Sequence, residues 1–216
     1  MRWTTVVALV ALAGTALWAD EGKERAFKFQ KDDVGKVPTG WKAEQTGKGE
    51  GSVWKLVQDV TAPSKSGLAL AQTAKSPGAV FNICVAEDTN YKDVELSVSF
   101  KAVAGESDQG GGFVWRYKDH NNYYICRMNP LEDNYRVYHV VAGKRIQIGG
   151  KEGVKVPAGE WHKLKVEAKG NKMEGYLDGQ KLWEVTDDTF KDAGKVGLWS
   201  KADAQTHFEE FKAEGE

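Results

Sequence analysis

Two arginines and a tyrosine stand close together in the segment 112–128, which is also rich in aromatic residues. Side chains alternate between the two faces of a β-strand. If this segment is a hairpin that turns at residues 119–122, then Arg116, Tyr123 and Arg127 share one face. Guanidinium groups bind planar acceptors through paired N–H groups, and tyrosine adds a ring and a hydroxyl. We expect this face to bind sugar hydroxyls or a carboxylate. An ordinary solvent-facing sheet with salt-bridged arginines is the alternative.

The opposite face of the same hairpin is predicted to belong to the hydrophobic core. Phe113, Trp115 and Tyr117 occupy every second position of its first strand. With a two-residue turn, Tyr117 is expected to lie opposite Tyr124, and Trp115 opposite Cys126. The prediction that the two arginines share the other face depends on this alternation being uninterrupted.

Two further side chains could supply a general base. His139 lies on the predicted strand 135–141, and Asp187 lies in the loop 186–193. Imidazole and carboxylate groups are the side chains that most often act as bases in enzymes. Each residue also has a structural interpretation, as a histidine within a strand and as a solvated loop acid.

The sequence contains no cluster that is typical of a metal site. Its four histidines are not spaced as in zinc sites, and no calcium loop of the EF-hand type occurs. We therefore predict no metal and no cofactor, while a calcium site of backbone carbonyls and single acids stays open. Glu209 and Glu210 are neighbours on a predicted strand. They are expected to face opposite sides and not to form a pair of catalytic carboxylates.

Alternating polar and apolar residues predict the elements that position these side chains. The clearest alternation runs over residues 93–101 and 163–168. Ala142-Gly143 and Asp178-Gly179 have the turn chemistry of tight hairpins, and helical periodicity is nearly absent. Regularly spaced short strands predict an all-β fold, a jelly-roll sandwich of two antiparallel sheets. Further strands are expected at 52–57, 68–72, 79–85, 112–117, 123–128, 135–141, 172–177, 195–199 and 207–213.

The N-terminal residues 1–19 have the pattern of a secretory signal peptide. Arg2 precedes an apolar run from Val6 to Leu17, and Ala19 stands before Asp20. An uncleaved membrane anchor is the alternative. Residues 20–216 are predicted to form a single β-sandwich domain. We expect a secreted or periplasmic protein of the cell envelope.

Charge and cysteine content restrict the partners and the redox chemistry. The chain has 30 Lys and Arg against 31 Asp and Glu, without a polybasic run. We therefore expect no nucleic-acid partner and no membrane contact beyond the signal segment. Cys84 and Cys126 both lie in predicted strands. A disulfide and a pair of buried thiols are both open.

Many segments, in the same order, resemble the 3-keto-disaccharide hydrolase-type domain family. The similarity extends from about Trp41 to Phe211. Where the family usually has Phe-Asp-Asp-Phe, this chain has Phe208-Glu209-Glu210-Phe211, so the role of that acid pair is open. The segments that carry the resemblance are Gly112–Arg116, Asn122–Tyr124 with Arg127, Leu131–Asn134, Val137–Val140, Gly159–Leu164, Asp178-Gly179, Thr186–Phe190 and Gly194–Asp203.

The resemblance implies a concanavalin A-like jelly roll, bacterial secretion and a saccharide or glycan as partner. It also implies cleavage of 3-keto-glycosidic bonds. A 3-keto group acidifies the neighbouring C2 proton, so cleavage needs a base and a cation near the oxyanion. His139 or Asp187 is the expected base, and one of the two arginines is the expected cation. A non-catalytic lectin-like module and a purely structural envelope protein are the alternatives. The expected substrate contacts are Arg116, Tyr123, Arg127 and Trp199.

Overall fold

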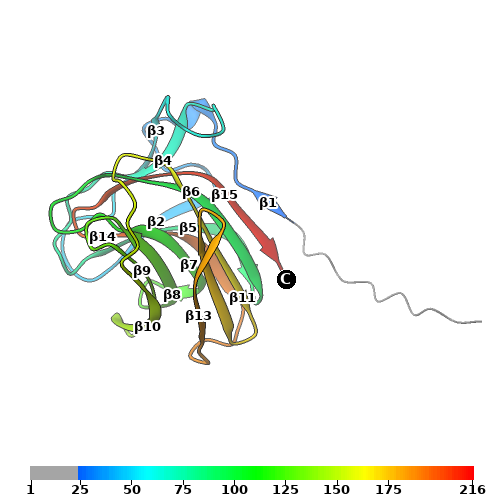
Figure 1. The fold of residues 1–216 in the computed structure, drawn as a ribbon. Coiled ribbons are helices and arrows are strands. Elements are labelled where there is room, and N and C mark those ends of the chain that lie inside the picture. The colour runs from blue at the N-terminus through cyan, green and yellow to red at the C-terminus, as the bar shows by residue number, and fades with distance from the viewer. Residues whose placement is uncertain (1–23) are drawn as a thin grey trace, which may run out of the picture.

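The chain forms two antiparallel β-sheets that pack face to face (Figure 1). The computed structural model describes residues 24–216, so the predicted signal peptide lies outside the described residues. In chain order the strands are β1 (Arg25–Ala26), β2 (Trp41–Thr46), β3 (Trp54–Gln58), β4 (Leu68–Gln72), β5 (Phe81–Tyr91), β6 (Val94–Ala104), β7 (Gly111–Asp119), β8 (Asn122–Asn129), β9 (Asn134–Val141), β10 (Lys144–Glu152), β11 (His162–Lys169), β12 (Lys172–Leu177), β13 (Gln180–Thr186), β14 (Gly194–Lys201) and β15 (Gln205–Gly215).

The strand order is that of a two-sheet sandwich. Sheet A has the order β13-β12-β11-β6-β15-β4-β3, with β1 beside β15, and sheet B has the order β10-β9-β8-β7-β14-β5-β2. One 3-10 turn, η1 (Lys31–Asp33), is the helical element of the described part. Between residues 24 and 216, no helix is long and apolar enough to span a membrane. The predicted all-β, two-sheet jelly-roll fold is confirmed.

Two hairpin turns have the backbone that their sequences predict. Ala142 and Asp178 each have a φ of 49°, and the glycines that follow, Gly143 and Gly179, have φ values of 77° and 82°. Positive φ at both central positions matches the twist of the flanking strands in a two-residue hairpin. The turn at 142–143 therefore fixes the register of β10 on β9.

The space between the sheets holds the main hydrophobic core. Side chains of one parity along each strand fill it, including Trp115 and Phe208. Cys84 on β5 and Cys126 on β8 are buried free thiols in this core. Two strands, β7 and β14, separate them. The cysteines are therefore about 14 Å apart across the sheet, beyond the reach of a disulfide.

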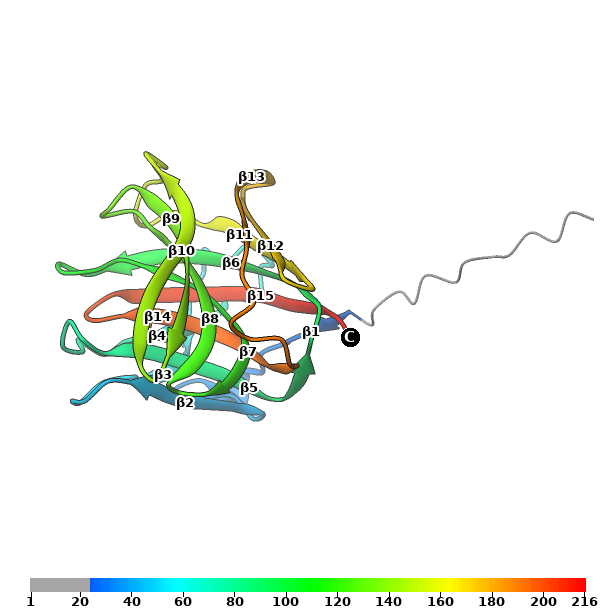
Figure 2. The ribbon, with the colours of Figure 1, turned by 90° about the horizontal axis from the view of Figure 1, so that it is seen from below.

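The outer face of sheet B holds a second buried cluster, formed by side chains of the opposite parity such as Ile83, Ile125 and Trp199. Thr46, on the edge strand β2, shares a hydrogen bond of 2.6 Å with the hydroxyl of Tyr123 on β8, four strands away. In a flat sheet these strands would lie about 19 Å apart. Sheet B therefore curls around this cluster, and Figure 2 shows the curved strands β8–β10. The face expected to be open is closed by its own side chains.

A β-bulge interrupts the predicted alternation in β7. Arg116 has a φ of 45°, and the pairing of β7 with β8 shifts between Trp115 and Asp119. Two extra residues of β7 lie within this interval. As a result Trp115 pairs with Tyr124 and not with Cys126. The predicted hairpin register is therefore wrong by two residues, although the turn itself has the expected length.

The same bulge overturns the prediction that the two arginines share a face. Tyr117 lies with Val114 in the outer cluster, not in the core. Arg127 also lies on the outer side, with its guanidinium carbon 5.8 Å from the centre of the Tyr138 ring. Arg116, at the bulge itself, points toward the loops at the end of the sandwich. The bulge reverses the alternation between the two arginines, so they cannot contact one ligand together.

A second bulge, in β15, places Glu209 and Glu210 on the same side of sheet A. Glu210 has a φ of 53°, and the register shifts between Glu209 and Lys212. Glu209 accepts hydrogen bonds from the backbone N–H (3.1 Å) and the hydroxyl of Ser64, and Glu210 accepts one of 3.0 Å from Ser99. The prediction that the two acids face opposite sides is wrong. Glu209 instead holds the loop that precedes β4.

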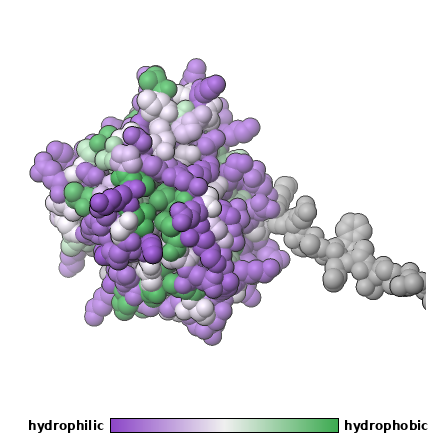
Figure 3. All heavy atoms as spheres, in the orientation of Figure 1, coloured by the Kyte–Doolittle hydropathy of each residue, from purple (hydrophilic) through white to green (hydrophobic). Residues whose placement is uncertain are grey.

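The surface is mainly hydrophilic in the view of Figure 3, with a compact apolar area near its centre. Lysine–glutamate pairs cover the outer face of sheet A, for example Lys165 with Glu95 at 3.3 Å. Exposed pairs of this kind contribute little stability. The stability of the fold therefore comes mainly from the two apolar clusters.

Candidate functional site

Arg145, near the start of β10, is the most unusual charged residue of the described chain. Its guanidinium carbon lies 4.5 Å, 5.0 Å and 5.6 Å from the ring centres of Tyr138, Phe81 and Trp199. No hydrogen bond or ion pair joins it to another residue between 24 and 216, and its Nη1 atom is buried. Burial lowers the pKa of this guanidinium. We call Phe81, Arg127, Tyr138, Arg145 and Trp199 the arginine patch.

Arg127 forms the second cationic part of the arginine patch. Its Nη1 donates to Asn134 Oδ1 and its Nη2 donates to Glu132 Oε2, both at 2.6 Å. Its Nε is buried and has no acceptor among the described residues. Burial alone would raise the pKa of Glu132, but the charge and hydrogen bond of Arg127 hold it below its usual value. Glu132 therefore stays ionised and is a poor proton acceptor.

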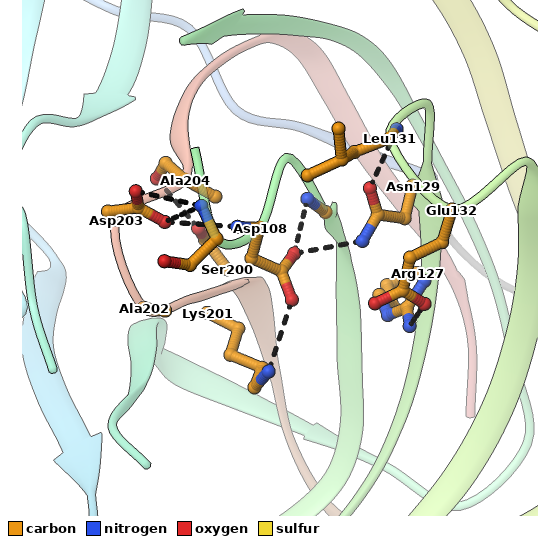
Figure 4. A network of polar contacts seen from close by, with 12 residues as sticks. Asp108, Arg127, Asn129, Leu131, Glu132, Ser200, Lys201, Ala202, Asp203 and Ala204 are labelled. Carbon is orange, nitrogen blue, oxygen red and sulfur yellow. Dashed lines mark hydrogen bonds and ion pairs between the residues drawn. The ribbon is translucent and has the colours of Figure 1, made fainter. Parts of the chain in front are cut away.

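A buried carboxylate, Asp108, borders the arginine patch (Figure 4). It accepts hydrogen bonds from the backbone of Gly110 at 2.7 Å and from Asn129 Nδ2 at 3.1 Å, and it pairs with Lys201 at 3.3 Å. Asp203 braces the same loop by accepting bonds from three consecutive backbone N–H groups. This border is thus rigid and its charges are paired.

Tyr123 and Trp199, two of the expected substrate contacts, lie deep in the outer cluster. Neither side chain is exposed, and the Tyr123 hydroxyl is bonded to Thr46. The Trp199 indole N–H lies near that hydroxyl but makes no hydrogen bond of standard geometry. A ligand can therefore reach them only after Arg145, which covers the Trp199 ring, has moved.

His139 and Asp187, the two expected bases, lie together at one end of the sandwich. His139 Nδ1 is 3.4 Å from Asp187 Oδ2 and 3.0 Å from Thr189 Oγ1. Tyr124 donates a hydrogen bond of 2.6 Å to Asp187 Oδ1. Burial alone would raise the pKa of Asp187, but the bonds from Tyr124 and Thr189 and the charge of His139 hold it below its usual value. Asp187 therefore orients the imidazole and is itself a weak base.

Tyr124 connects this pair to the core. Burial, followed by the hydrogen bond to Asp187, raises the pKa of its phenol to about 12. Its oxygen also accepts the backbone N–H of Phe190 at 3.1 Å. With Nδ1 of His139 engaged by Asp187 and Thr189, Nε2 is the ring nitrogen left for a substrate.

Arg116 anchors the loops at this end. It donates to the carbonyl oxygens of Lys92 (2.9 Å), Phe190 (2.7 Å) and Gly170 (2.5 Å), and it pairs with Asp93 at 3.4 Å. These bonds occupy each of its three nitrogen atoms. The guanidinium therefore ties three separate chain segments together.

A cavity of about 260 Å³ lies beside Asp187. Arg116 and Asp187 line it together with the cations Lys92 and Lys191. His139 does not line it, but its ring contacts the same carboxylate. This end of the sandwich thus combines a hollow, an oriented imidazole and two lysines.

The expected site residues consequently separate into two groups. Arg127, Tyr123 and Trp199 lie on the outer side of sheet B. His139, which pairs with Tyr124 of the inner core, lies on its inner side with Asp187 and Arg116. The expected combination of His139 as base and Arg127 as cation is therefore not assembled, because the sheet separates them.

Sequence reasoning missed Arg145, Asp108, Glu132 and Lys201. A signal for Arg145 was present, because the turn at 142–143 pairs it with Val140. Val140 has the same parity as Tyr138, which belongs to the outer cluster. Asp108 lies in the loop before β7 and Lys201 at the end of β14, and only the fold brings them together.

Solved structures with similar folds share little sequence with this chain. A carbohydrate-binding module, CBM66 of Bacillus subtilis, has a TM-score of 0.65 at 19% identity, covering 82% of this chain and 96% of that one. A B. subtilis protein of unknown function with a galectin-like fold has a TM-score of 0.56 at 10% identity (86% and 91%). Xylan beta-1,4-xylosidase of Bacillus halodurans has a TM-score of 0.55 at 11% identity, covering 87% of this chain and 40% of that one. At such identities these likenesses show the fold alone.

Sequence comparison identifies the family. No curated protein matches the chain. The sequence model of the family described as 3-keto-alpha-glucoside-1,2-lyase-like domain matches residues 29–213, which is nearly all of the described part. The chain therefore belongs to the 3-keto-alpha-glucoside-1,2-lyase-like domain family.

Proposed function

We propose that this protein binds a saccharide at the arginine patch. The observation that carries the proposal is Arg145, a largely buried guanidinium that lies against three aromatic rings and has no acceptor among residues 24–216. A buried donor without a partner costs about 1–3 kcal/mol, so such a group is stabilised by a ligand that brings acceptor oxygens. Sugars bring many such oxygens in their hydroxyl groups.

The family and the fold support the same partner. The family is described by an activity on an alpha-glucoside, and one fold neighbour is described as a carbohydrate-binding module. The patch also offers polar groups that a sugar can reach, namely the partly exposed Arg145 and the carboxylate of Glu132 at its border. Export of the chain, which the N-terminal pattern predicts, would bring it to extracytoplasmic glycans, and cell fractionation tests that part.

Affinity measurements with a matched pair of variants test the binding proposal. Arg145→Met removes the patch cation, while Lys144→Met removes an equal charge from the exposed neighbouring residue. Isothermal titration with oligosaccharides that bind the wild type should show at least about a tenfold loss for Arg145→Met. Lys144→Met should bind as the wild type does. Equal affinities for wild type and Arg145→Met would contradict the proposal.

A second candidate function is cleavage of 3-keto-glycosidic bonds at the His139–Asp187 pair. The 3.4 Å contact orients the imidazole, and the family description points to this reaction. His139 Nε2 would remove the C2 proton, a C1–C2 double bond would form as the C1–O bond breaks, and the imidazolium would return the proton to the leaving aglycone oxygen. Lys92 or Lys191, not Arg127, would stabilise the oxyanion at C3, because these lysines line the adjacent cavity.

Product release tests this second candidate. Incubation with 3-keto-sucrose or 3-keto-trehalose should release the second sugar at a rate that falls by about 100-fold or more in His139→Asn. The variant keeps a polar side chain whose amide can bond to Asp187 and Thr189 as Nδ1 does, and it should remain folded. Release that is absent in the wild type, or unchanged in the variant, rules the pair out as the catalytic base.

A further inference from the structure

We propose that the sugar bound at the arginine patch is anionic and carries a carboxylate or sulfate ester that pairs with Arg145. This inference rests on the proposed saccharide binding and narrows it to one chemical class. It follows from how charges are paired around the patch.

Every other cation at the patch has a carboxylate of its own. Arg127 pairs with Glu132 at 2.6 Å, and Lys201 pairs with Asp108 at 3.3 Å. Arg136, beside them on β9, pairs with Glu152 at 2.7 Å. Arg145 has no such partner within the described chain, so the patch carries one uncompensated positive charge. A neutral sugar would leave that charge in place.

The surroundings of Arg145 raise the free energy of its charged guanidinium in the protein without a ligand. Asp108 and Glu132 act on it only from a distance, without an ion pair. The three rings beneath it compensate part of the lost hydration, since a cation over an aromatic face gains about 0.5–2 kcal/mol. The rings provide no acceptor for its N–H groups, however. An anion would supply both the acceptors and the missing charge.

The geometry of the guanidinium selects the kind of anion. Its planar fork of N–H groups matches carboxylate, phosphate and related oxyanions through two parallel hydrogen bonds. Every other arginine in residues 24–216 donates to a protein acceptor, including Arg25, Arg116 and Arg136. Arg145 alone donates to no acceptor in this part of the chain. In carbohydrates such anions are the carboxylate of a uronic acid and the ester group of a sulfated sugar.

Matched ligands that differ only in charge test the inference. Oligomers of galacturonate, glucuronate and mannuronate are compared with their carboxyl-reduced neutral forms, and sulfated galactose oligomers with the unsulfated ones. At low salt, at least one anionic member should bind about tenfold more tightly than its neutral partner. That preference should weaken as salt is raised and disappear in Arg145→Gln. The uronate and sulfate arms then identify the group.

The outcomes separate this inference from the proposal it rests on. Equal binding of anionic and neutral members, or a preference that persists in Arg145→Gln, overturns the anionic assignment and leaves saccharide binding intact. If only neutral sugars bind, the anionic assignment is likewise overturned and saccharide binding stands. If no sugar of either kind binds the folded wild type, the saccharide proposal fails, and the anionic assignment fails with it.

Discussion

Arg145 in the arginine patch is partly exposed with its Nη1 atom buried, whereas Arg116 at the end of the sandwich is fully buried, and the two arginines also differ in their partners. Arg116 donates to three backbone carbonyls and pairs with Asp93. Arg145 donates to no residue of the described chain. Buried polar groups in folded proteins are nearly always hydrogen-bonded. A satisfied guanidinium is thus explained by the fold, whereas an unsatisfied one points to a ligand.

Replacing each arginine by methionine should give the largest difference between the two regions. Arg116→Met leaves three carbonyl groups without a donor and should lower the free energy of unfolding by about 3–5 kcal/mol. Arg145→Met removes no protein hydrogen bond and should change it by about 1 kcal/mol or less. Urea denaturation monitored by tryptophan fluorescence measures both. If Arg145→Met destabilises the fold as much as Arg116→Met, the patch is structural.

The bulge that separates the two regions should be sensitive to a single methyl group. A Cβ atom on Gly194 would lie 2.6 Å from the backbone carbon of Arg116. Gly194→Ala should therefore strain the bulge and lower the free energy of unfolding by about 1–3 kcal/mol. Gly78→Ala is the control, because a Cβ atom there meets nothing within 4 Å. If Gly194→Ala leaves the free energy of unfolding unchanged, the bulge is not closely packed.

Acid should weaken the sandwich end through Asp187. Its pKa is lowered in the folded state, so its bonds to Tyr124, Thr189 and His139 contribute stability above the unfolded-state pKa of about 3.9. That stability is lost as the pH falls through the folded-state pKa. The stability difference between wild type and Asp187→Asn should thus shrink below about pH 4. A difference independent of pH between 6 and 2 would contradict this assignment.

The fold was predictable from the sequence because strands such as β11 and β12 alternate between buried and partly exposed residues, and turn residues separate the strands. β4 and β12 have the predicted bounds, and the two hairpin turns have the predicted backbone. The edge strand β2 was not predicted. It buries only its first and last residues, Trp41 and Thr46, so it carries no two-residue periodicity.

The candidate site was less predictable because it depends on irregular backbone. Alternation placed Tyr123, Ile125 and Arg127 together correctly, since β8 is regular. The same rule failed at Arg116 and Glu210, where non-glycine residues with positive φ add residues to a strand. Neither residue type signals such a bulge. The contact of His139 with Asp187 joins residues 48 positions apart and could not be inferred without the strand order.

Nuclear magnetic resonance of the side-chain N–H groups tests most directly whether the sugar binds at the arginine patch. The Arg127 Nε–H, Arg145 Nε–H and Trp199 Nε1–H signals report on the patch, and the imidazole signals of His139 report on the sandwich end. During titration with a sugar that binds, the patch signals should shift in a saturable manner while those of His139 stay unchanged. Saturable shifts of His139 with unchanged arginine and Trp199 signals would contradict the placement of the site.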